Sequence, residues 1–297
     1  TGQKFAALFK CTGTDSSIGA AQYAGVYQHI EAQNLQQLNY GTSAAKDLTL
    51  SFWVKSNTTG TYSIGMGKAD STTYYIALTY TIDSADTWEK KVIHISPTAG
   101  STSLITGANG VINNDHGTGF NMFIHTASPN TWTSSAVYGT SDQPNLMSST
   151  SNNWYITGLQ LEVGDTASDF EHLPHDVQLQ RCKRYYQKLT GSYAQFGQIM
   201  NGHYNGTTQF QGAYTYPVQM RTSPTLSHTT TSSNNSSSAY AIATVGSIDY
   251  IDALLLYNAN DHATLIYTAG NASNDTGMGG NMYVQSTITE LALVSEL

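Results

Sequence analysis

The sequence predicts an all-β protein in which a sandwich or barrel is followed by a helix and a second β-rich segment. Charged residues make up 11% of the 297 residues, while Tyr (20) and Gly (26) are abundant; an average domain carries about 25% charged residues. Apolar and polar residues alternate in many short runs, as they do in half-buried strands. Turns rich in Gly, Asn and Pro separate these runs without intervening helices, which favours a sandwich or barrel.

The first half of the chain contains the clearest strand signals. Because successive side chains of a strand point to opposite faces, residues 48–55 would bury one apolar face, formed by Leu48, Leu50, Phe52 and Val54. Residues 74–82 alternate in the same way, with an apolar face of Tyr74, Ile76, Leu78, Tyr80 and Ile82. Further strands are predicted at residues 23–30, 61–65, 89–95, 119–125 and 154–161.

The pattern changes after Glu162, where a helix is predicted. Pro174 suits the first turn of a helix, and Asp176 would lie near its positive end. Apolar side chains recur at helical spacing and would form a buried stripe of Leu179, Cys182, Tyr186 and Leu189. These signals divide the chain into a first domain (1–172), a linker helix (173–191) and a C-terminal β domain (192–297).

Alternation returns in the C-terminal domain, which predicts a second, smaller β-sandwich. The alternating runs are residues 214–220, 248–256, 263–268 and 281–293. Between residues 227 and 238 the chain is almost entirely Ser, Thr and Asn. Such a stretch lacks apolar side chains to bury, so a mobile exposed loop is expected there.

The charge of the chain argues against one class of function. The net charge is −8 and the pI is about 5.5, whereas nucleic-acid binding needs a basic face that neutralises phosphates. The one basic cluster, Arg181, Lys183 and Arg184, is expected to be a solvated face of the helix. No apolar run is long enough to span a membrane. Neither nucleic-acid binding nor membrane insertion is therefore expected.

Catalytic chemistry has weak support. Glycan hydrolysis needs two carboxylates across a scissile bond, and two acidic sets qualify by position: Asp83, Asp86 and Glu89, and then Glu162, Asp165, Asp169 and Glu171. Both sets fall at strand ends or turns, where acidic residues cap the backbone. Glu171 with His172 and His175 suggests a metal site only superficially, because HxxH lacks a third ligand. We therefore assign no catalytic residue and expect a protein that is not an enzyme.

Sugar binding is the better-supported chemistry, because it needs exposed rings beside amide and carboxylate groups. Two segments of the first domain combine those residue types. One contains Asn113, Asp115 and His116, and the other contains Trp132 and Tyr138. Core packing is the alternative role for Trp132, since Trp is usually well buried. The loop at residues 277–281 of the C-terminal domain is an equal candidate.

Several segments, in the same order, resemble virion proteins of tailed bacteriophages. They are residues 28–31 (QHIE), 48–55 (LTLSFWVK), 80–82 with 87–89 (YTI and TWE), 117–120 (GTGF) and 154–186 (WYITGLQLEVGDTASDFEHLPHDVQLQRCKRYY). Residues 218–224 (VQMRTSP) resemble a strand of the C-terminal module of such proteins, and 295–297 (SEL) resemble their end, so Leu297 is expected to be the C-terminus. The proteins that this chain resembles usually begin with a segment that carries an Ile-Asn-Gly motif and a Trp, and this segment is absent here. A missing N-terminal part is therefore expected to attach the chain to other virion proteins.

The resemblance implies a jelly roll similar to carbohydrate-binding modules for the first domain, and a homotrimer on the exterior of the virion. A virion protein folds in the reducing cytosol of its host, so Cys11 and Cys182 are expected to be free thiols, with a single bridge as the alternative. No cofactor is expected. A structural calcium ion, which such modules often carry, would find candidate ligands in Glu31 and Glu162.

Three functions follow from these observations. The preferred one is a fibre or spike protein that adsorbs to host surface polysaccharide, where repeated weak sites gain avidity through effective concentration. The alternative is a capsid decoration or head-fibre protein without a receptor role. A polysaccharide depolymerase is the least favoured, because it requires a carboxylate pair in a cleft.

Overall fold

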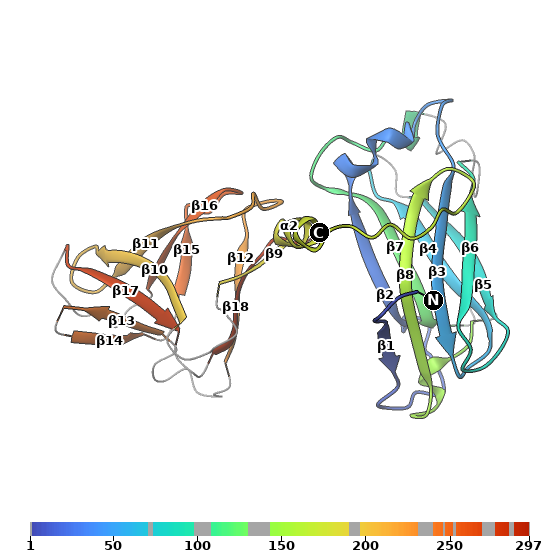
Figure 1. Ribbon diagram of the computed structural model, residues 1–297, viewed down its shortest axis with the longest axis horizontal. Helices are drawn as coiled ribbons and strands as arrows, with labels where there is room; N and C mark the ends of the chain where they lie inside the picture. Colours follow the sequence, from blue (N-terminus) through green and yellow to red (C-terminus); the bar gives the residue numbers. More distant parts are fainter. Residues whose placement is uncertain are drawn as a thin grey trace. The chain divides into compact units, whose positions relative to one another are not determined.

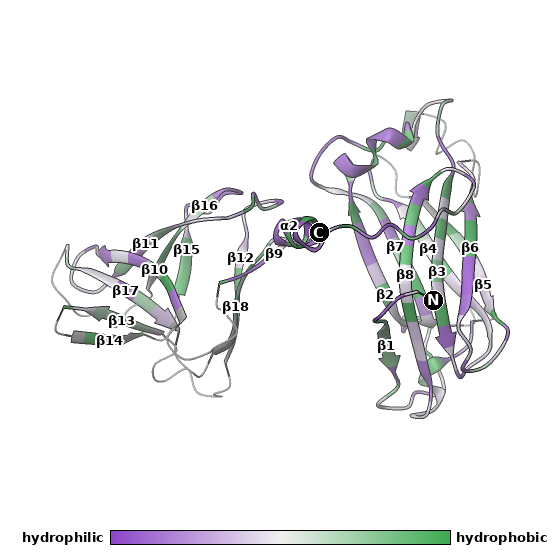
Figure 2. Ribbon diagram, viewed as in Figure 1, coloured by the Kyte–Doolittle hydropathy of each residue, from purple (hydrophilic) through white to green (hydrophobic). Residues whose placement is uncertain are grey.

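The computed structural model describes residues 2–70, 74–97, 108–129, 143–189, 197–230, 240–245, 247–251, 254–268, 277–284 and 288–296. The chain forms two compact units that divide between His172 and Leu173 (Figure 1). Antiparallel strands build both units, which confirms the predicted all-β class. Hydrophobic and hydrophilic residues are interspersed along these strands (Figure 2), as expected where one face of each strand is buried.

The first unit contains strands β1 (Ala7–Lys10), β2 (Ala24–Glu31), β3 (Leu48–Ser56), β4 (Gly60–Lys68), β5 (Tyr74–Ile82), β6 (Glu89–Ile95), β7 (Thr118–Ala127) and β8 (Asn153–Val163). Its 3-10 helices are η1 (Ala32–Leu38), η2 (Ala108–Gly110) and η4 (Leu146–Ser148). The second unit contains helix α2 (His175–Lys183) and strands β9 (Tyr186–Lys188), β10 (Gly197–Tyr204), β11 (Phe210–Thr215), β12 (Thr225–Thr230), β13 (Tyr240–Thr244), β14 (Ser247–Ile251), β15 (Leu254–Tyr257), β16 (Ala263–Thr268), β17 (Gly279–Val284) and β18 (Ile288–Val294).

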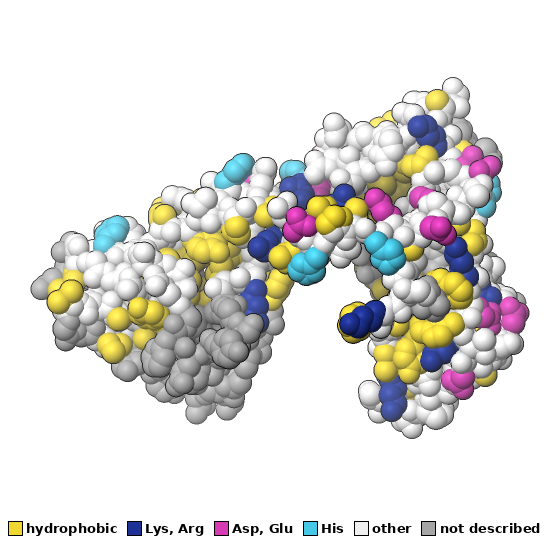
Figure 3. All heavy atoms as spheres, in the orientation of Figure 1, with side chains coloured by type: hydrophobic (Ala, Val, Ile, Leu, Met, Phe, Trp, Pro, Cys, Tyr) yellow, Lys and Arg dark blue, Asp and Glu magenta, His cyan; other side chains and the backbone are white. Residues whose placement is uncertain are grey.

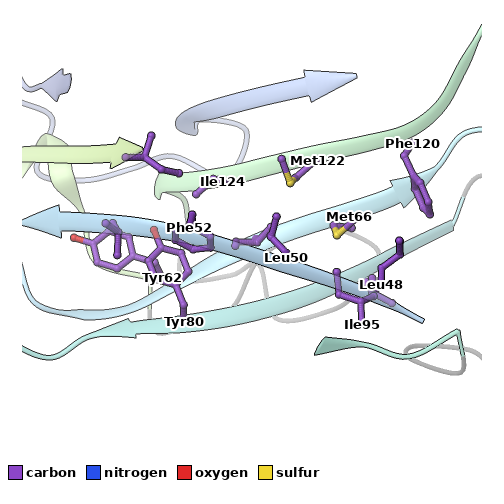
Figure 4. Close-up of a cluster of buried hydrophobic side chains, with 14 of the residues drawn as sticks. Leu48, Leu50, Phe52, Tyr62, Met66, Tyr80, Ile95, Phe120, Met122 and Ile124 are labelled. Atoms are coloured by element: carbon purple, nitrogen blue, oxygen red, sulfur yellow. The ribbon is translucent and has the colours of Figure 1, made fainter. Parts of the chain in front are cut away.

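Two four-stranded sheets enclose the core of the first unit, with strand orders β1-β8-β3-β6 and β2-β7-β4-β5. The predicted apolar face of β3 is fully inside this core, where Phe52 lies close to Tyr62 and Tyr80 of the opposite sheet (Figure 4). Burying one such side chain contributes about 1.5–3 kcal/mol. The two facing sheets agree with a sandwich, and the more specific jelly-roll arrangement stays a prediction.

The predicted strands of the first unit are all present, and two of them, β5 and β6, have the predicted bounds. Strand β1 was not predicted, because four residues are too few to show alternation. It pairs antiparallel with β8, with Phe9 opposite Trp154. β1 and β2 are therefore edge strands of their sheets, each paired with a single neighbour among the described strands.

The predicted linker helix at 173–191 is wrong in its second half. Helix α2 ends at Lys183, and residues 186–188 form strand β9, which pairs with β18. Leu179 is 44% exposed and Cys182 is also exposed, so the predicted buried stripe does not exist. The reason is that the backbone of residues 186–188 obtains its hydrogen bonds from β18, a strand distant in sequence, and propensity is routinely overridden by such tertiary pairing.

The second unit has its own core and two sheets. A seven-stranded sheet has the order β14-β13-β17-β10-β11-β16-β15, and a three-stranded sheet has the order β12-β18-β9. The buried side chains of its main core include Tyr204, Phe210, Ile242, Ile251, Ile266 and Met282. Because the core residues of the two units form separate clusters, each unit has the hydrophobic core that an independent domain requires.

Three strand predictions in the second unit need correction. The run at 214–220 ends as a strand at Thr215, and beyond it the N–H groups of Tyr216 and Met220 donate to the carbonyl oxygens of His262 (2.9 Å) and Asp261 (2.8 Å). Residues 218–224 are therefore not a strand. The run at 248–256 corresponds to two strands, β14 and β15, and the run at 281–293 to β17 and β18.

The expected mobile loop at 227–238 is wrong at its start. Residues 227–230 belong to β12 and pair with β18, with Ser227 opposite Ala292. β-Branched Thr residues favour strands even in a polar run, and a polar side chain is compatible with pairing when one face of the strand meets water. Residues 231–238 lie outside the described residues.

Candidate functional site

The outer face of β2 and β7 carries a row of rings and polar side chains. Met122 and Ile124 of β7 are buried in the core, so the alternate residues of β7 lie on the opposite face. The register places Tyr27 opposite Phe123 and His29 opposite Asn121. We refer to one set of residues as the aromatic strip: Tyr23, Tyr27, His29, Asn121, Phe123 and His125.

Phe123 holds the two tyrosines of the strip. Its ring centroid lies 5.1 Å from that of Tyr23, edge to face at 85°, and 5.4 Å from that of Tyr27. Such ring pairs contribute about 0.5–1.5 kcal/mol beyond burial. Tyr23 is 56% exposed and Tyr27 is 47% exposed. The strip therefore presents two oriented tyrosine rings to solvent.

Polar groups lie directly beside these rings. The amide oxygen Oδ1 of Asn121 is 2.8 Å from Nδ1 of His29, and because an amide oxygen only accepts, His29 donates from Nδ1. The other ring nitrogen, Nε2, can form a further hydrogen bond. The ring of Tyr27 meets His29 at 4.4 Å. Rings and hydrogen-bonding groups are thus adjacent, which is the combination that sugar binding requires.

His125 belongs to the strip but is buried. Its side chain is 2% exposed, and burial lowers the pKa of its imidazole to about 4, because desolvation disfavours the charged form. Its ring centroid lies 4.4 Å from that of Phe123. At neutral pH His125 is therefore an uncharged ring that supports Phe123.

The predicted residues Asn113, Asp115 and His116 lie in an exposed loop at one end of the strip. The backbone N–H of Gln33 donates to the carbonyl oxygen of Asp115 (2.9 Å), which ties the loop to η1 just after β2. Oδ1 of Asp115 accepts from the N–H of Gly117 (2.8 Å), so this carboxylate stabilises the loop itself. Thr118, at the start of β7, lies 3.4 Å from Nδ1 of His29. Trp132 and Tyr138 lie outside the described residues.

The two calcium candidates are on different sheets. Glu31 is buried at the end of β2 and accepts from Nε2 of Gln33 at 2.6 Å. Glu162, on β8, accepts from the hydroxyl (2.6 Å) and the N–H (2.9 Å) of Ser168. Each glutamate has its own local hydrogen bonds. Among the described residues, which include His172 and His175, no three His, Cys, Asp or Glu side chains lie together as a metal site would require.

The acidic sets considered for hydrolysis serve turns. The carboxylate of Glu89 accepts from the N–H of Asp83 (3.0 Å) and of Ser84 (2.8 Å) and pairs with Nζ of Lys91 (2.5 Å). Burial raises the pKa of Glu89, but the hydrogen bonds from Lys91 and the two N–H groups outweigh it and lower this pKa. The hydroxyl and N–H of Ser168 likewise lower the pKa of Glu162.

A pocket of about 370 Å³ opens beside the aromatic strip. Tyr23 and Phe123 of the strip line this pocket, together with Gly25 of β2. Its other walls come from β1 and η4. The described residues of the lining are Phe9, Lys10, Tyr23, Ala24, Gly25, Phe123, Thr126, Leu146 and Met147. None of these described residues carries a carboxylate. Figure 3 shows hydrophobic side chains at the surface of the first unit in the region of β1.

A second aromatic group lies on the other sheet, around Lys55. The ammonium of Lys55 is 4.6 Å from the ring centroid of Tyr155 and 5.4 Å from that of Trp88. The ammonium is attracted to the negative faces of these rings. It therefore covers the faces on which a ligand would stack. The aromatic strip, whose tyrosines are exposed, is therefore the better candidate site.

The sequence did not predict the aromatic strip. The alternation that identified β2 and β7 also places Tyr27 and His29, and Asn121 and Phe123, on their outward faces. A mixture of rings and polar groups on an outward strand face was the available signal. No protein-family model matches the chain, and no curated protein is significantly similar to it. Within the described part of the chain, no helix has the length and apolar character of a membrane span.

Proposed function

We propose that this chain is a virion protein of a tailed bacteriophage that adsorbs to host surface polysaccharide through the aromatic strip. The observation that carries the proposal is the arrangement of the exposed rings of Tyr23 and Tyr27 beside the His29–Asn121 hydrogen bond. Aromatic faces carry partial negative charge and suit the C–H faces of a sugar ring. The neighbouring imidazole and amide suit its hydroxyl groups. In this proposal the first unit is a jelly-roll module.

The site is open and shallow, so a single copy would bind weakly. Several copies held in one assembly gain avidity, because the second contact occurs at a high effective concentration. We therefore propose a homotrimer as the working form, on the outside of the particle. Sedimentation of the purified protein tests this part, with an expected mass of three times the 32.0 kDa chain. A stable monomer would contradict it.

The adsorption test uses fluorescently labelled protein on an array of bacterial surface polysaccharides, followed by bacteria that carry any polysaccharide that binds. We expect saturable binding that the free polysaccharide abolishes by competition. Failure of folded, oligomeric protein to bind any polysaccharide or cell would contradict the proposal and favour a decoration protein. Release of shortened polysaccharide from the array would instead indicate a depolymerase.

Matched variants locate the site. Tyr23, on the strip, and Tyr257, on β15 of the second unit, are both 56% exposed, so Tyr23→Ala and Tyr257→Ala remove equally accessible rings. We expect Tyr23→Ala to weaken binding about tenfold, which corresponds to about 1.4 kcal/mol, and Tyr257→Ala to leave it unchanged. Asn121→Ala should also weaken binding. The opposite result for the two tyrosines would move the site to the second unit.

A further inference from the structure

We propose that the pocket beside the aromatic strip binds one acidic sugar residue of the polysaccharide, with Lys10 pairing with its carboxylate. This inference rests on the proposed function, because it names the kind of glycan that the same surface would select. Its basis is the size of the pocket, its apolar walls and Lys10, the cationic side chain among the described lining residues.

The pocket has the size and rigidity of a site for one ring. Its volume of about 370 Å³ is at the lower end of the range of about 300–1,000 Å³ for small-molecule sites. Phe9 meets the buried ring of Trp154 edge to face at 5.6 Å, and Leu146, the first residue of η4, is buried. On the other side, Phe123 holds Tyr23. The walls are therefore fixed by packing, and a ligand with an apolar face fits between them.

The charge of the lining selects for an anion. Lys10 lies on β1 and is exposed, and within the described residues it forms no ion pair. Asp15 is tied to the lining through its backbone, because its N–H donates to the carbonyl oxygen of Met147 (2.8 Å). Its carboxylate instead accepts from the N–H of Ser17 (3.0 Å). A ligand carboxylate would thus supply Lys10 with a charge-assisted hydrogen bond.

Continuity with the strip favours a sugar over another small acid. Tyr23 and Phe123 line both the pocket and the strip. A chain of sugar residues lying along Tyr27 and Tyr23 would therefore reach the pocket with its next residue. A carboxylate on that residue would meet Lys10, while its ring would lie against Phe9 and Met147.

The first test changes the ligand. A polysaccharide that binds on the array is compared with the same polysaccharide after carbodiimide activation and borohydride reduction, which convert its carboxylates to primary alcohols. We expect the reduced form to bind about tenfold more weakly. Equal binding of both forms, or selective binding of neutral polysaccharides, would overturn this inference and leave the proposed function intact. Absence of any binding would overturn both.

The second test changes the protein. Lys10→Gln should lower affinity for the acidic polysaccharide about tenfold and leave affinity for its reduced form unchanged. Lys10→Arg keeps the charge and should retain affinity. The matched control is Lys4→Gln, which removes an equal charge from an exposed lysine that does not line the pocket. An equal loss in the Lys10→Gln and Lys4→Gln variants would mean that net charge, and not the pocket, decides binding.

The third test locates the ligand. The chain has seven methionines, so protein labelled with ¹³C at the methionine methyl groups gives a simple spectrum, and Met147→Leu assigns one signal. An oligosaccharide fragment of the acidic polysaccharide should shift the Met147 signal, because Met147 lines the pocket. It should leave Met282 unchanged, since Met282 is buried in the core of the second unit. A bound fragment that leaves Met147 unshifted would overturn the assignment to this pocket.

Discussion

The indole Nε1–H of Trp154 donates a hydrogen bond to the hydroxyl oxygen of Tyr80 at 3.2 Å, and this bond joins the two sheets of the first unit. Both side chains are buried. The ring of Tyr80 also stacks on Tyr62 at 5.4 Å and meets Phe52 edge to face at 5.1 Å. Burial raises the pKa of the Tyr80 hydroxyl well above its usual value. A neutral polar contact between the sheets therefore lies within a cluster of buried rings.

Tyr80→Phe should destabilise the first unit by about 1–3 kcal/mol, because it leaves the buried indole N–H without its acceptor. The measurement is urea unfolding followed by tryptophan fluorescence. All four tryptophans lie in residues 1–172, so this signal reports on the first unit alone. Tyr155→Phe, on the outer face of the same unit, is the control and should change stability by less than about 0.5 kcal/mol. Equal effects of the two variants would contradict the role given to the Trp154–Tyr80 bond.

The stability of the first unit should fall as the pH falls from about 6.5 to about 4. Burial lowers the pKa of His125 to about 4 in the folded state, against about 6.5 in the unfolded chain. The unfolded state therefore binds more protons in this window, so the contribution is complete above the unfolded pKa and is lost on acidification. The full effect is on the order of 3 kcal/mol, at about 1.4 kcal/mol per pKa unit.

The pH effect is measured by urea unfolding at pH 7.5, 6 and 5, again by tryptophan fluorescence. The comparison is with His125→Phe, which keeps a buried ring and has no group that titrates. We expect the slope of stability against pH in this window to be smaller in the variant. If both proteins lost stability in parallel, His125 would not be the responsible group.

Glu89→Gln should destabilise the turn between β5 and β6. The carboxylate of Glu89 accepts hydrogen bonds from the N–H groups of Asp83 and Ser84 and pairs with Lys91. An amide keeps one acceptor but loses the charge, and hydrogen bonds to charged groups contribute about 1.5–3 kcal/mol. Asp86→Asn is the control, since Asp86 has a φ of 53°, a conformation that Asn also tolerates. The measurement is the midpoint of thermal unfolding of both variants. An equal decrease of this midpoint in Asp86→Asn and Glu89→Gln would show the prediction wrong.

One of the two cysteines should react quickly with a thiol reagent. Both are free, as expected from the sequence, with Cys182 exposed on α2 and Cys11 buried. The Sγ of Cys11 donates to the carbonyl oxygen of Gly13 at 3.2 Å. Native protein should therefore release one equivalent of chromophore with Ellman's reagent, and urea should release the second. Loss of the fast phase in Cys182→Ser identifies its source, and two fast thiols in the native protein would contradict the burial of Cys11.

Local pattern was sufficient for strands in which apolar and polar side chains alternate. In β3 every second side chain from Leu48 to Val54 is buried in the core, so alternation alone identified it. The aromatic strip could not be predicted in this way, because Tyr27 and Phe123 are neighbours only through the register of β2 with β7. Neither strand carries that register in its own sequence. The predicted loop at Asn113 lies near this surface because the same register places the start of β7 beside the end of β2.

The C-terminal half shows where spacing misleads. Tyr186 and Leu189 continue the spacing of Leu179 and Cys182, so the sequence predicted one helix. In the structure, Tyr186 lies opposite Val294 in a strand pair. Pairing with β18, which is distant in sequence, makes residues 186–188 a strand. A single sequence does not show which distant segments will pair. Runs of alternation that cross a turn, such as 248–256, failed because alternation does not show where a strand ends.

The pairing of β9 with β18 has a consequence for how the chain is made. Lys188 lies opposite Ala292, so the ribosome produces β9 about 100 residues before its partner. At about 5–20 residues per second, this strand waits for about 5–20 s without its partner. In the first unit β1 waits in the same way for β8, with Phe9 opposite Trp154, but all its described strands have emerged with β8. A chain that stopped between these two strands would therefore keep every described strand of the first unit and leave β9 without its partner.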